Sequence, residues 1–165
     1  MARLTPSDEL EIDFQIDFDD AVIGRQEKSL TMANGAFVHE LCNSRTFCRQ
    51  SDIENMRARG LILGGSVSSA VVVDGERVVT PGGMRHADEP VRHKMLDALG
   101  DLSLAGAPIL GRYEGLKAGH AMTNMLLRAL FADPTTFDLV ECSPEMTARL
   151  PGAGVKSSDV ARIAA

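Results

Sequence analysis

Two different hydrophobic periods divide the chain into strand-like and helix-like parts. An apolar residue occupies every second position from 10 to 18, and this period of two predicts a half-buried strand. Between residues 89 and 105 apolar residues instead recur every three or four positions, which predicts a long amphipathic helix. Asp88 can cap this helix, and Pro90 is tolerated in its first turn.

Shorter signals predict the other elements. Asp52 can cap a helix that ends near Arg59, where Gly60 suits the left-handed position after the last turn. Asp74 and Gly75 together are a signal for a tight hairpin turn. Further strands are expected at 29–32, 45–50, 69–73, 77–80, 107–113 and 138–142, and further helices at 36–43 and 120–132. Strands and helices do not alternate regularly, so the pattern favours an α+β layer fold.

Composition narrows the class of protein. The chain has 165 residues and a net charge of −6, which speaks against a nucleic-acid partner. It has no apolar run long enough to span a membrane, and residues 1–6 do not form the apolar core of a signal peptide. The cysteines, Cys42, Cys48 and Cys142, are odd in number and have no CxxC spacing. We therefore expect a cytoplasmic protein without disulfides.

Three polar side chains share the side of the long helix opposite its apolar face. His93, Asp97 and Asp101 follow one another at intervals of four residues. A histidine and a carboxylate one turn apart can bind a single zinc ion. The same pattern also fits an ordinary solvated helix face, and a catalytic zinc usually has three protein ligands. Both interpretations stay open on spacing alone.

His120 is the second notable imidazole. It follows Gly119 at an expected helix start, where the helix dipole disfavours a charged imidazolium. A protonated His120 would therefore need an acidic partner, and Asp101 is a candidate. The alternative is a surface or capping histidine.

The segment at 91–102, VRHKMLDALGDL, resembles a signature of the UDP-3-O-acyl-N-acetylglucosamine deacetylase family, which acts in lipid A synthesis. Other motifs similar to those of the family occur in the same order, so the resemblance extends from about Leu10 to Asp133. These motifs are Arg45-Thr-Phe47, Asp52-Ile-Glu54, Gly60-Leu61, Gly64-Gly-Ser66, Ala70-Val-Val-Val73, Pro81-Gly-Gly83, Ala105-Gly106, Lys117 and Gly119-His-Ala121.

The resemblance implies the second of two similar domains that enclose a zinc ion. The expected architecture is a two-layer sandwich of a mixed sheet with helices, comprising residues 10–142. It includes a small strand-helix-strand insert at 47–79, and a flexible tail is expected at 143–165.

Roles for individual residues follow from the resemblance only. It implies that His93 and Asp97 are zinc ligands and that His120 is the general acid or electrostatic partner. Asp101 would orient His120, and Thr46 would stabilise the tetrahedral intermediate.

Substrate contacts are implied in the same way. Lys94 and Lys117 match lysines near the sugar and diphosphate, Phe18 matches an aromatic residue that stacks on uracil, and Phe47 is a further expected contact. Phe18 also continues the alternating strand, so a core position remains an alternative.

The expected insert would line a passage for the acyl chain. The apolar residues assigned to this passage are Ile53, Leu61, Ile62, Val67 and Val72. An ordinary core role fits them equally well.

The chain departs from the family pattern in one major respect. It has no HExH-like segment, which in the family supplies the general base and the third zinc ligand. Smaller departures are Asp20 in place of histidine, Arg49 in place of an aromatic residue, and Thr123 in place of asparagine.

The expected activity is zinc-dependent deacetylation of UDP-3-O-acyl-N-acetylglucosamine, with this chain as the carboxy-terminal half of the enzyme. The isolated chain is expected to be inactive, because the missing amino-terminal domain would carry the base and one ligand. Half of a split enzyme, or a non-catalytic module that binds UDP-sugars or acyl groups, are the alternatives.

Overall fold

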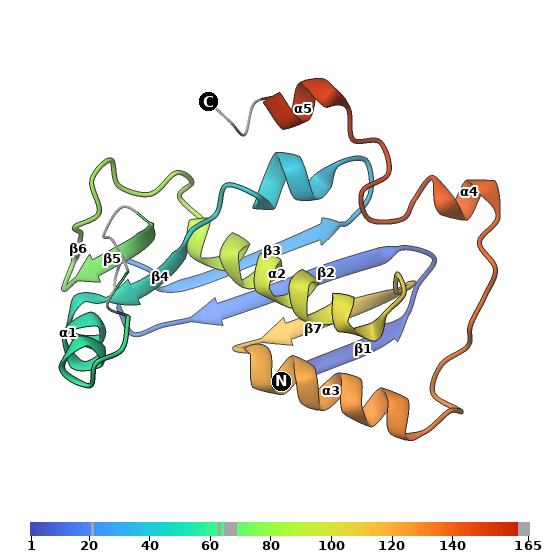
Figure 1. The fold of residues 1–165 in the computed structure, drawn as a ribbon, viewed down its shortest axis with the longest axis horizontal. Helices are drawn as coiled ribbons and strands as arrows, with labels where there is room; N and C mark the ends of the chain where they lie inside the picture. Colours follow the sequence, from blue (N-terminus) through green and yellow to red (C-terminus); the bar gives the residue numbers. More distant parts are fainter. Residues whose placement is uncertain (21, 63, 65–68, 162–165) are drawn as a thin grey trace.

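The computed structural model describes residues 1–20, 22–62, 64 and 69–161. A four-stranded mixed sheet in the order β1-β7-β2-β3 forms its centre (Figure 1). β7 is parallel to β2, whereas β1 and β3 are antiparallel to their neighbours. The strands are β1 (Ala2–Pro6), β2 (Leu10–Asp17), β3 (Arg25–Thr31) and β7 (Gly111–Leu116).

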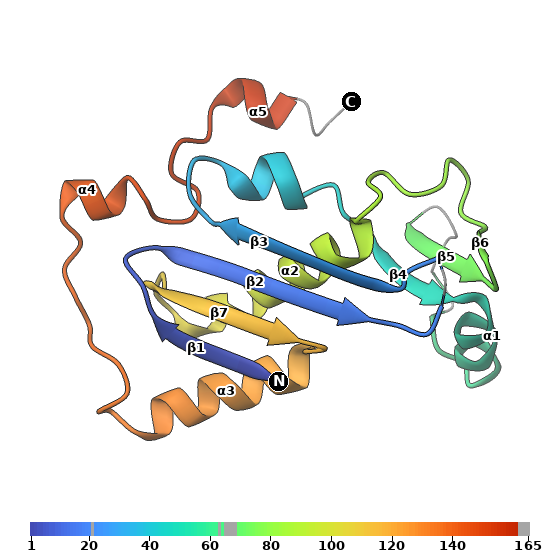
Figure 2. The same ribbon diagram turned by 180° about the vertical axis from the view of Figure 1, so that it is seen from behind.

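Helices cover one face of this sheet. α2 (Glu89–Leu102) packs on β2 and β3, and α3 (His120–Ala132) packs beside α2 and against β1. The short π-helix η1 (Phe37–Leu41) contacts α2. Seen from behind, the opposite face of the sheet carries no helix formed by the described residues (Figure 2). The expected α+β architecture of helices on a mixed sheet is therefore confirmed.

Alternation along β2 explains why the helices lie on this face. Its apolar residues are buried and its polar residues are on the other side, as a period of two requires. Val91, Met95, Ala98 and Leu102 of α2 are buried in the same core as these residues. The hydroxyl groups of Tyr113 on β7 and Thr123 on α3 are hydrogen-bonded at 2.9 Å, which ties α3 to the sheet. Gly115 lies so close to the Phe14 ring that a Cβ atom would come within 2.6 Å of it.

A second, three-stranded sheet projects beside the main one. It has the order β4-β5-β6, with β4 (Thr46–Arg49) parallel to β5 (Ala70–Asp74) and β5 antiparallel to β6 (Arg77–Val78). α1 (Gln50–Ala58) connects β4 to β5. This is the expected strand-helix-strand unit. Gly60 has a φ of +74° after α1, as its position predicts.

Several element predictions differ from the structure. β1 was not predicted, and β7 begins four residues later than expected. The pairing of Asp74 with Arg77 places the hairpin loop at 75–76, one residue beyond the prediction. α2 ends at Leu102, and the 3-10 helix η2 (Ser103–Ala105) follows it.

The strand predicted at 138–142 is wrong, because these residues have no regular secondary structure. After them come two short helices, α4 (Pro144–Thr147) and α5 (Ser157–Ala161), and α5 contacts η1.

Candidate functional site

The central feature of the site is a histidine–carboxylate pair on α2. His93 Nε2 lies 3.3 Å from Asp97 Oδ1, and both side chains are mostly buried. The four-residue spacing places them one turn apart on one helix face. Lys94 adds a positive charge, because its Nζ donates a 2.7 Å hydrogen bond to Asp97 Oδ2.

The surroundings of His93 define how its ring is oriented. Nδ1 lies 3.3 Å from the carbonyl oxygen of Ser44. A carbonyl oxygen only accepts hydrogen bonds, so this contact is a hydrogen bond in the tautomer that carries its proton on Nδ1. Nε2 then presents its lone pair to a carboxylate oxygen unless the ring is protonated twice. Two acceptors at this distance need a cation between them, either a proton or a metal ion.

His120 and Asp101 form a second pair beside the first. His120 Nδ1 lies 2.9 Å from Asp101 Oδ1 and 3.0 Å from Oδ2. The other ring nitrogen, Nε2, is 3.8 Å from Asp97 Oδ2. The structure thus brings together the four residues that the sequence placed on α2 and at the start of α3. His120 is largely exposed, whereas both carboxylates are mostly buried.

A buried ion pair fixes the strand that precedes the site. Glu89 is fully buried at the start of α2, and it accepts hydrogen bonds from the backbone N–H and the guanidinium group of Arg45. Burial raises the pKa of Glu89, but these bonds and one from the Arg85 backbone outweigh burial, so the pKa lies below its ordinary value. The pair anchors the backbone next to Thr46, which is exposed at the start of β4.

Sequence reasoning missed Glu89, although it placed the residue in the correct helical turn. Its partner, Arg45, lies 44 residues away, so no local spacing could connect them.

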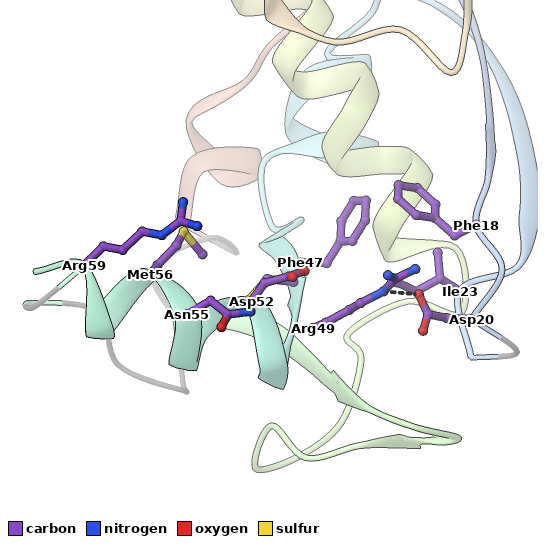
Figure 3. A pocket seen from close by; sticks show the side chains of 10 residues that line it. Phe18, Asp20, Ile23, Phe47, Arg49, Asp52, Asn55, Met56 and Arg59 are labelled. Carbon is purple, nitrogen blue, oxygen red and sulfur yellow. Dashed lines mark hydrogen bonds and ion pairs between the residues drawn. The ribbon is translucent and has the colours of Figure 1, made fainter. Parts of the chain in front are cut away.

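An open groove of about 640 Å³ adjoins the site (Figure 3). The Phe47 ring lies edge-on to both His93 and Phe18, at centroid distances of 6.3 and 5.3 Å. Phe47 therefore links the α2 site to the groove. Phe18 is 37% exposed, so it is not enclosed in the core. The groove is lined by Phe18, Asp20, Ile23, Phe47, Cys48, Arg49, Asp52, Asn55, Met56 and Arg59.

An ion pair crosses one end of the groove. Arg49 Nε donates a 2.8 Å hydrogen bond to Asp20 Oδ2 (Figure 3), and this contact raises the pKa of the Arg49 guanidinium group. Arg49 is the last residue of β4, and Asp20 lies after β2. These are two of the positions at which the sequence departs from the family pattern, and they contact each other.

Lys117 lies at the end of β7 with a φ of +48°. Its Nζ pairs with Asp17 Oδ2 at 2.7 Å, and this hydrogen bond lowers the pKa of Asp17. Lys117 thus faces the end of β2, close in sequence to Phe18, while Lys94 is engaged at the α2 pair.

The residues expected along the acyl passage divide into two groups. Ile53 and Val72 are buried, whereas Leu61 and Ile62 are exposed. Val67 lies outside the described residues. The buried pair has an ordinary packing role, and Leu61 and Ile62 are the members that are accessible to a ligand.

The donor set of the α2 pair fits zinc, but only in part. Two donors bound tetrahedrally at about 2.0–2.1 Å from a zinc ion lie roughly 3.3 Å apart, which matches the His93–Asp97 distance. The Ser44 carbonyl also provides the outer contact that zinc-binding histidines usually make. Within the described part of the chain, no group of three or more His, Cys, Asp or Glu residues is placed to hold a metal ion. His93 and Asp97 therefore provide two ligands for a zinc ion.

Fold and site together define an α+β domain with paired histidine–carboxylate contacts beside a groove. Comparison with known proteins assigns the family. Residues 1–132 match the family model of LpxC, UDP-3-O-acyl N-acetylglycosamine deacetylase. The chain belongs to this family.

Curated relatives carry the name UDP-3-O-acyl-N-acetylglucosamine deacetylase. The protein from Phenylobacterium zucineum is 49% identical over 133 residues, which are 81% of this chain and 45% of the relative. That from an Anaeromyxobacter species is 41% identical over 155 residues, covering 93% of this chain and 51% of the relative. That from Neisseria meningitidis is 44% identical over 141 residues, covering 84% of this chain and 46% of the relative.

The chain spans about half the length of the curated relatives it matches, and the match lies in their carboxy-terminal half. None of the described helices has the length and apolar character needed to cross a membrane.

Proposed function

We propose that the chain forms the carboxy-terminal half of the active site of a zinc-dependent UDP-3-O-acyl-N-acetylglucosamine deacetylase that acts in the cytoplasm in lipid A synthesis. The observation that carries this proposal is the His93–Asp97 pair, whose donor atoms are spaced for one zinc ion. The names of the curated relatives supply the reaction and the substrate.

His93 and Asp97 would hold the zinc ion, with the remaining protein ligand and the general base supplied by the amino-terminal half. Zinc at this position supplies an electrophile for the amide carbonyl and lowers the pKa of water towards neutrality. The Ser44 carbonyl keeps the proton of His93 on Nδ1, which leaves Nε2 free to coordinate.

His120 is proposed to protonate the departing amine. Asp101 accepts a hydrogen bond from Nδ1, which leaves Nε2 to face the reacting nitrogen. The His120 side chain is largely exposed in this chain, so it is accessible to a substrate.

Thr46 is proposed to donate its hydroxyl proton to the oxyanion that develops on the amide carbonyl. Preorganised donors of this kind are effective because they need no rearrangement during the reaction. The buried Arg45–Glu89 pair provides this preorganisation, since it fixes the backbone adjacent to Thr46.

The groove is proposed to bind the nucleotide end of the substrate. Phe18 and Phe47 offer apolar ring surfaces, and Lys94 and Lys117 offer positive charges for the diphosphate. The groove also carries charged groups of both signs, Asp20, Arg49, Asp52 and Arg59, and apolar walls with a few placed polar groups suit a ligand that has a base at one end and phosphates beside it.

The test uses a fusion in which the amino-terminal half of the Anaeromyxobacter relative precedes this chain. With zinc, the fusion is expected to deacetylate UDP-3-O-acyl-N-acetylglucosamine, whereas the 165-residue chain alone is expected to be inactive. Absence of turnover in a folded, zinc-loaded fusion that still binds the substrate would instead favour a non-catalytic UDP-sugar module.

A further inference from the structure

The segment from 137 to 142, Phe-Asp-Leu-Val-Glu-Cys, runs along the outside of the molecule between α3 and α4 (Figures 1 and 2). Residues 138–142 are all exposed. Leu139 is 86% exposed and Val140 is 58% exposed. Leu139 has the largest exposed fraction among the exposed large hydrophobic side chains of the described chain. The apolar side chains of the segment are therefore exposed to solvent.

Both ends of the segment are nevertheless held in place. Before it, Asp133 accepts hydrogen bonds from the backbone and the hydroxyl group of Thr135. The ring of Phe137 packs edge-on against Phe131 of α3, at 5.2 Å between centroids. After it, the Ser143 side chain caps α4 by accepting a hydrogen bond from the Met146 backbone. The segment is therefore a positioned connection with two anchored ends.

The backbone between these anchors has no partner within the described residues. No N–H or C=O group of residues 137–142 makes a hydrogen bond to them. Yet the sequence has the composition of a strand, with β-branched and aromatic residues bounded by Pro134 and Pro144. As a strand it would place Phe137 and Leu139 on one side, and Val140 and Cys142 on the other.

In at least one relative, the segment lies within a longer chain. An alignment that covers 93% of this chain necessarily includes residues 137–142, and the Anaeromyxobacter relative is aligned to that extent. In that relative, the corresponding segment belongs to a chain about twice as long. The half-exposed Phe131 joins the segment to the end of α3, the helix that begins with His120 of the proposed active site.

Full-length pairing with a second copy of the segment is unfavourable. Antiparallel pairing of all six residues with their symmetry mates places Asp138 opposite Glu141, and it does so twice. Like charges directly opposite each other destabilise a strand pair.

We propose that residues 137–142 form a β-strand that pairs with an exposed edge strand in the amino-terminal half of the deacetylase. The pairing satisfies the free backbone groups and covers Leu139 or Val140, in the manner of β-strand addition. It thereby connects the two halves that the proposed function requires, and it rests on that proposal for the presence of the amino-terminal half.

Hydrogen exchange of the backbone amides tests the strand directly. In the isolated 165-residue chain, the amides of residues 138–142 should exchange rapidly. In the fusion of the amino-terminal half of the Anaeromyxobacter relative to this chain, the hydrogen-bonded amides should exchange at least about tenfold more slowly. Val140→Pro should remove this protection because proline interrupts strand pairing, whereas Val140→Thr, which keeps the N–H and the branched shape, should retain it.

Equal exchange in the chain and the fusion would overturn the proposal. Concentration-dependent protection in the chain alone, together with a dimer in sedimentation, would also overturn it by identifying a second copy as the partner. Should the fusion not fold by circular dichroism, the corresponding segment of the native Anaeromyxobacter deacetylase must be protected, and rapid exchange there would contradict the proposal. Turnover measured on the same fusion separates the two proposals: protection without turnover contradicts only the function, and turnover without protection contradicts only the strand.

Discussion

His93 Nε2 and Asp97 Oδ1 face each other at 3.3 Å on adjacent turns of α2. Nδ1 of the same ring is directed at the Ser44 carbonyl, and the tautomer with its proton on Nδ1 turns the Nε2 lone pair towards Asp97, where a shared cation would stabilise the contact. The spacing suits a zinc ion, and the site adjoins a second pair, His120 and Asp101.

Replacing His120 should slow the chemical step in the fusion. His120→Ala is expected to lower kcat by about 10²- to 10⁴-fold, the usual contribution of a general acid, with a smaller change in KM. Asp101→Ala should lower kcat less, because it removes the partner of the imidazole and leaves the ring. Steady-state assays as a function of pH check this, with the exposed Arg128→Ala on α3 as a control. A general acid must be protonated to act, so loss of the basic limb of the pH profile is expected only for His120→Ala, and an unchanged profile would contradict the assignment.

The Arg45–Glu89 pair should stabilise the fold in a pH-dependent way. The folded-state pKa of Glu89 is lowered from its ordinary value of 4.5. Its contribution is therefore fully present above about pH 4.5, and it is lost as the pH falls through the lowered pKa. Glu89→Gln should cost about 3–5 kcal/mol at neutral pH, since it leaves the mostly buried Arg45 without a counter-charge.

Urea denaturation at pH 7 and at progressively lower pH measures this difference. The exposed Glu54→Gln on α1 is the matched control, with an expected change within about 0.5 kcal/mol. A difference between wild type and Glu89→Gln that stays constant down to the lowest pH would show that Glu89 does not titrate as described.

The hydrogen bond between Tyr113 and Thr123 should matter for stability. Burial raises the pKa of Tyr113, and its hydroxyl group has Thr123 as its partner in the core. Thr123→Val should destabilise the chain by about 1–3 kcal/mol, because it leaves a buried hydroxyl unsatisfied. Thr123→Ser keeps the hydroxyl and should cost less. Chemical denaturation measures the free energy of unfolding of both variants. An equal loss of stability in the two variants would assign the effect to packing and not to the hydrogen bond.

The Arg49–Asp20 ion pair should influence substrate binding more than turnover. Both residues line the groove, away from the α2 pair. Arg49→Asp is expected to raise KM of the fusion about two- to fivefold at nearly unchanged kcat, as suits an exposed ion pair. The double exchange Asp20→Arg with Arg49→Asp should recover part of the loss. A double variant no better than Arg49→Asp would show that the two residues act independently.

The sequence predicts most of the main layer because its patterns are local. Alternation from 10 to 18 gave β2, and the three- to four-residue period gave α2, including the face that carries His93 and Asp97. β1 escaped prediction because its partly buried residues do not alternate, and its partner, β7, is more than a hundred residues away. The predicted strand at 138–142 did not form because strand propensity depends on a paired neighbour, and no strand of the described residues pairs with this segment.

The same distinction between local patterns and contacts of distant segments applies to the candidate site. Spacing on α2 suggested His93, Asp97 and Asp101, and the helix start suggested His120 with Asp101 as its partner. The Arg45–Glu89 and Arg49–Asp20 pairs join distant segments, so only the folded chain shows them.

Zinc binding by the fusion and by its His93→Ala and Asp97→Ala variants tests the central claim most directly. The zinc content of purified protein, measured together with deacetylation, should be about one ion per fusion molecule for the wild type. Each variant should lose both the tightly bound zinc and the activity while keeping the wild-type circular dichroism spectrum. Retention of stoichiometric zinc and normal turnover by either variant would show that the α2 pair does not hold the catalytic metal.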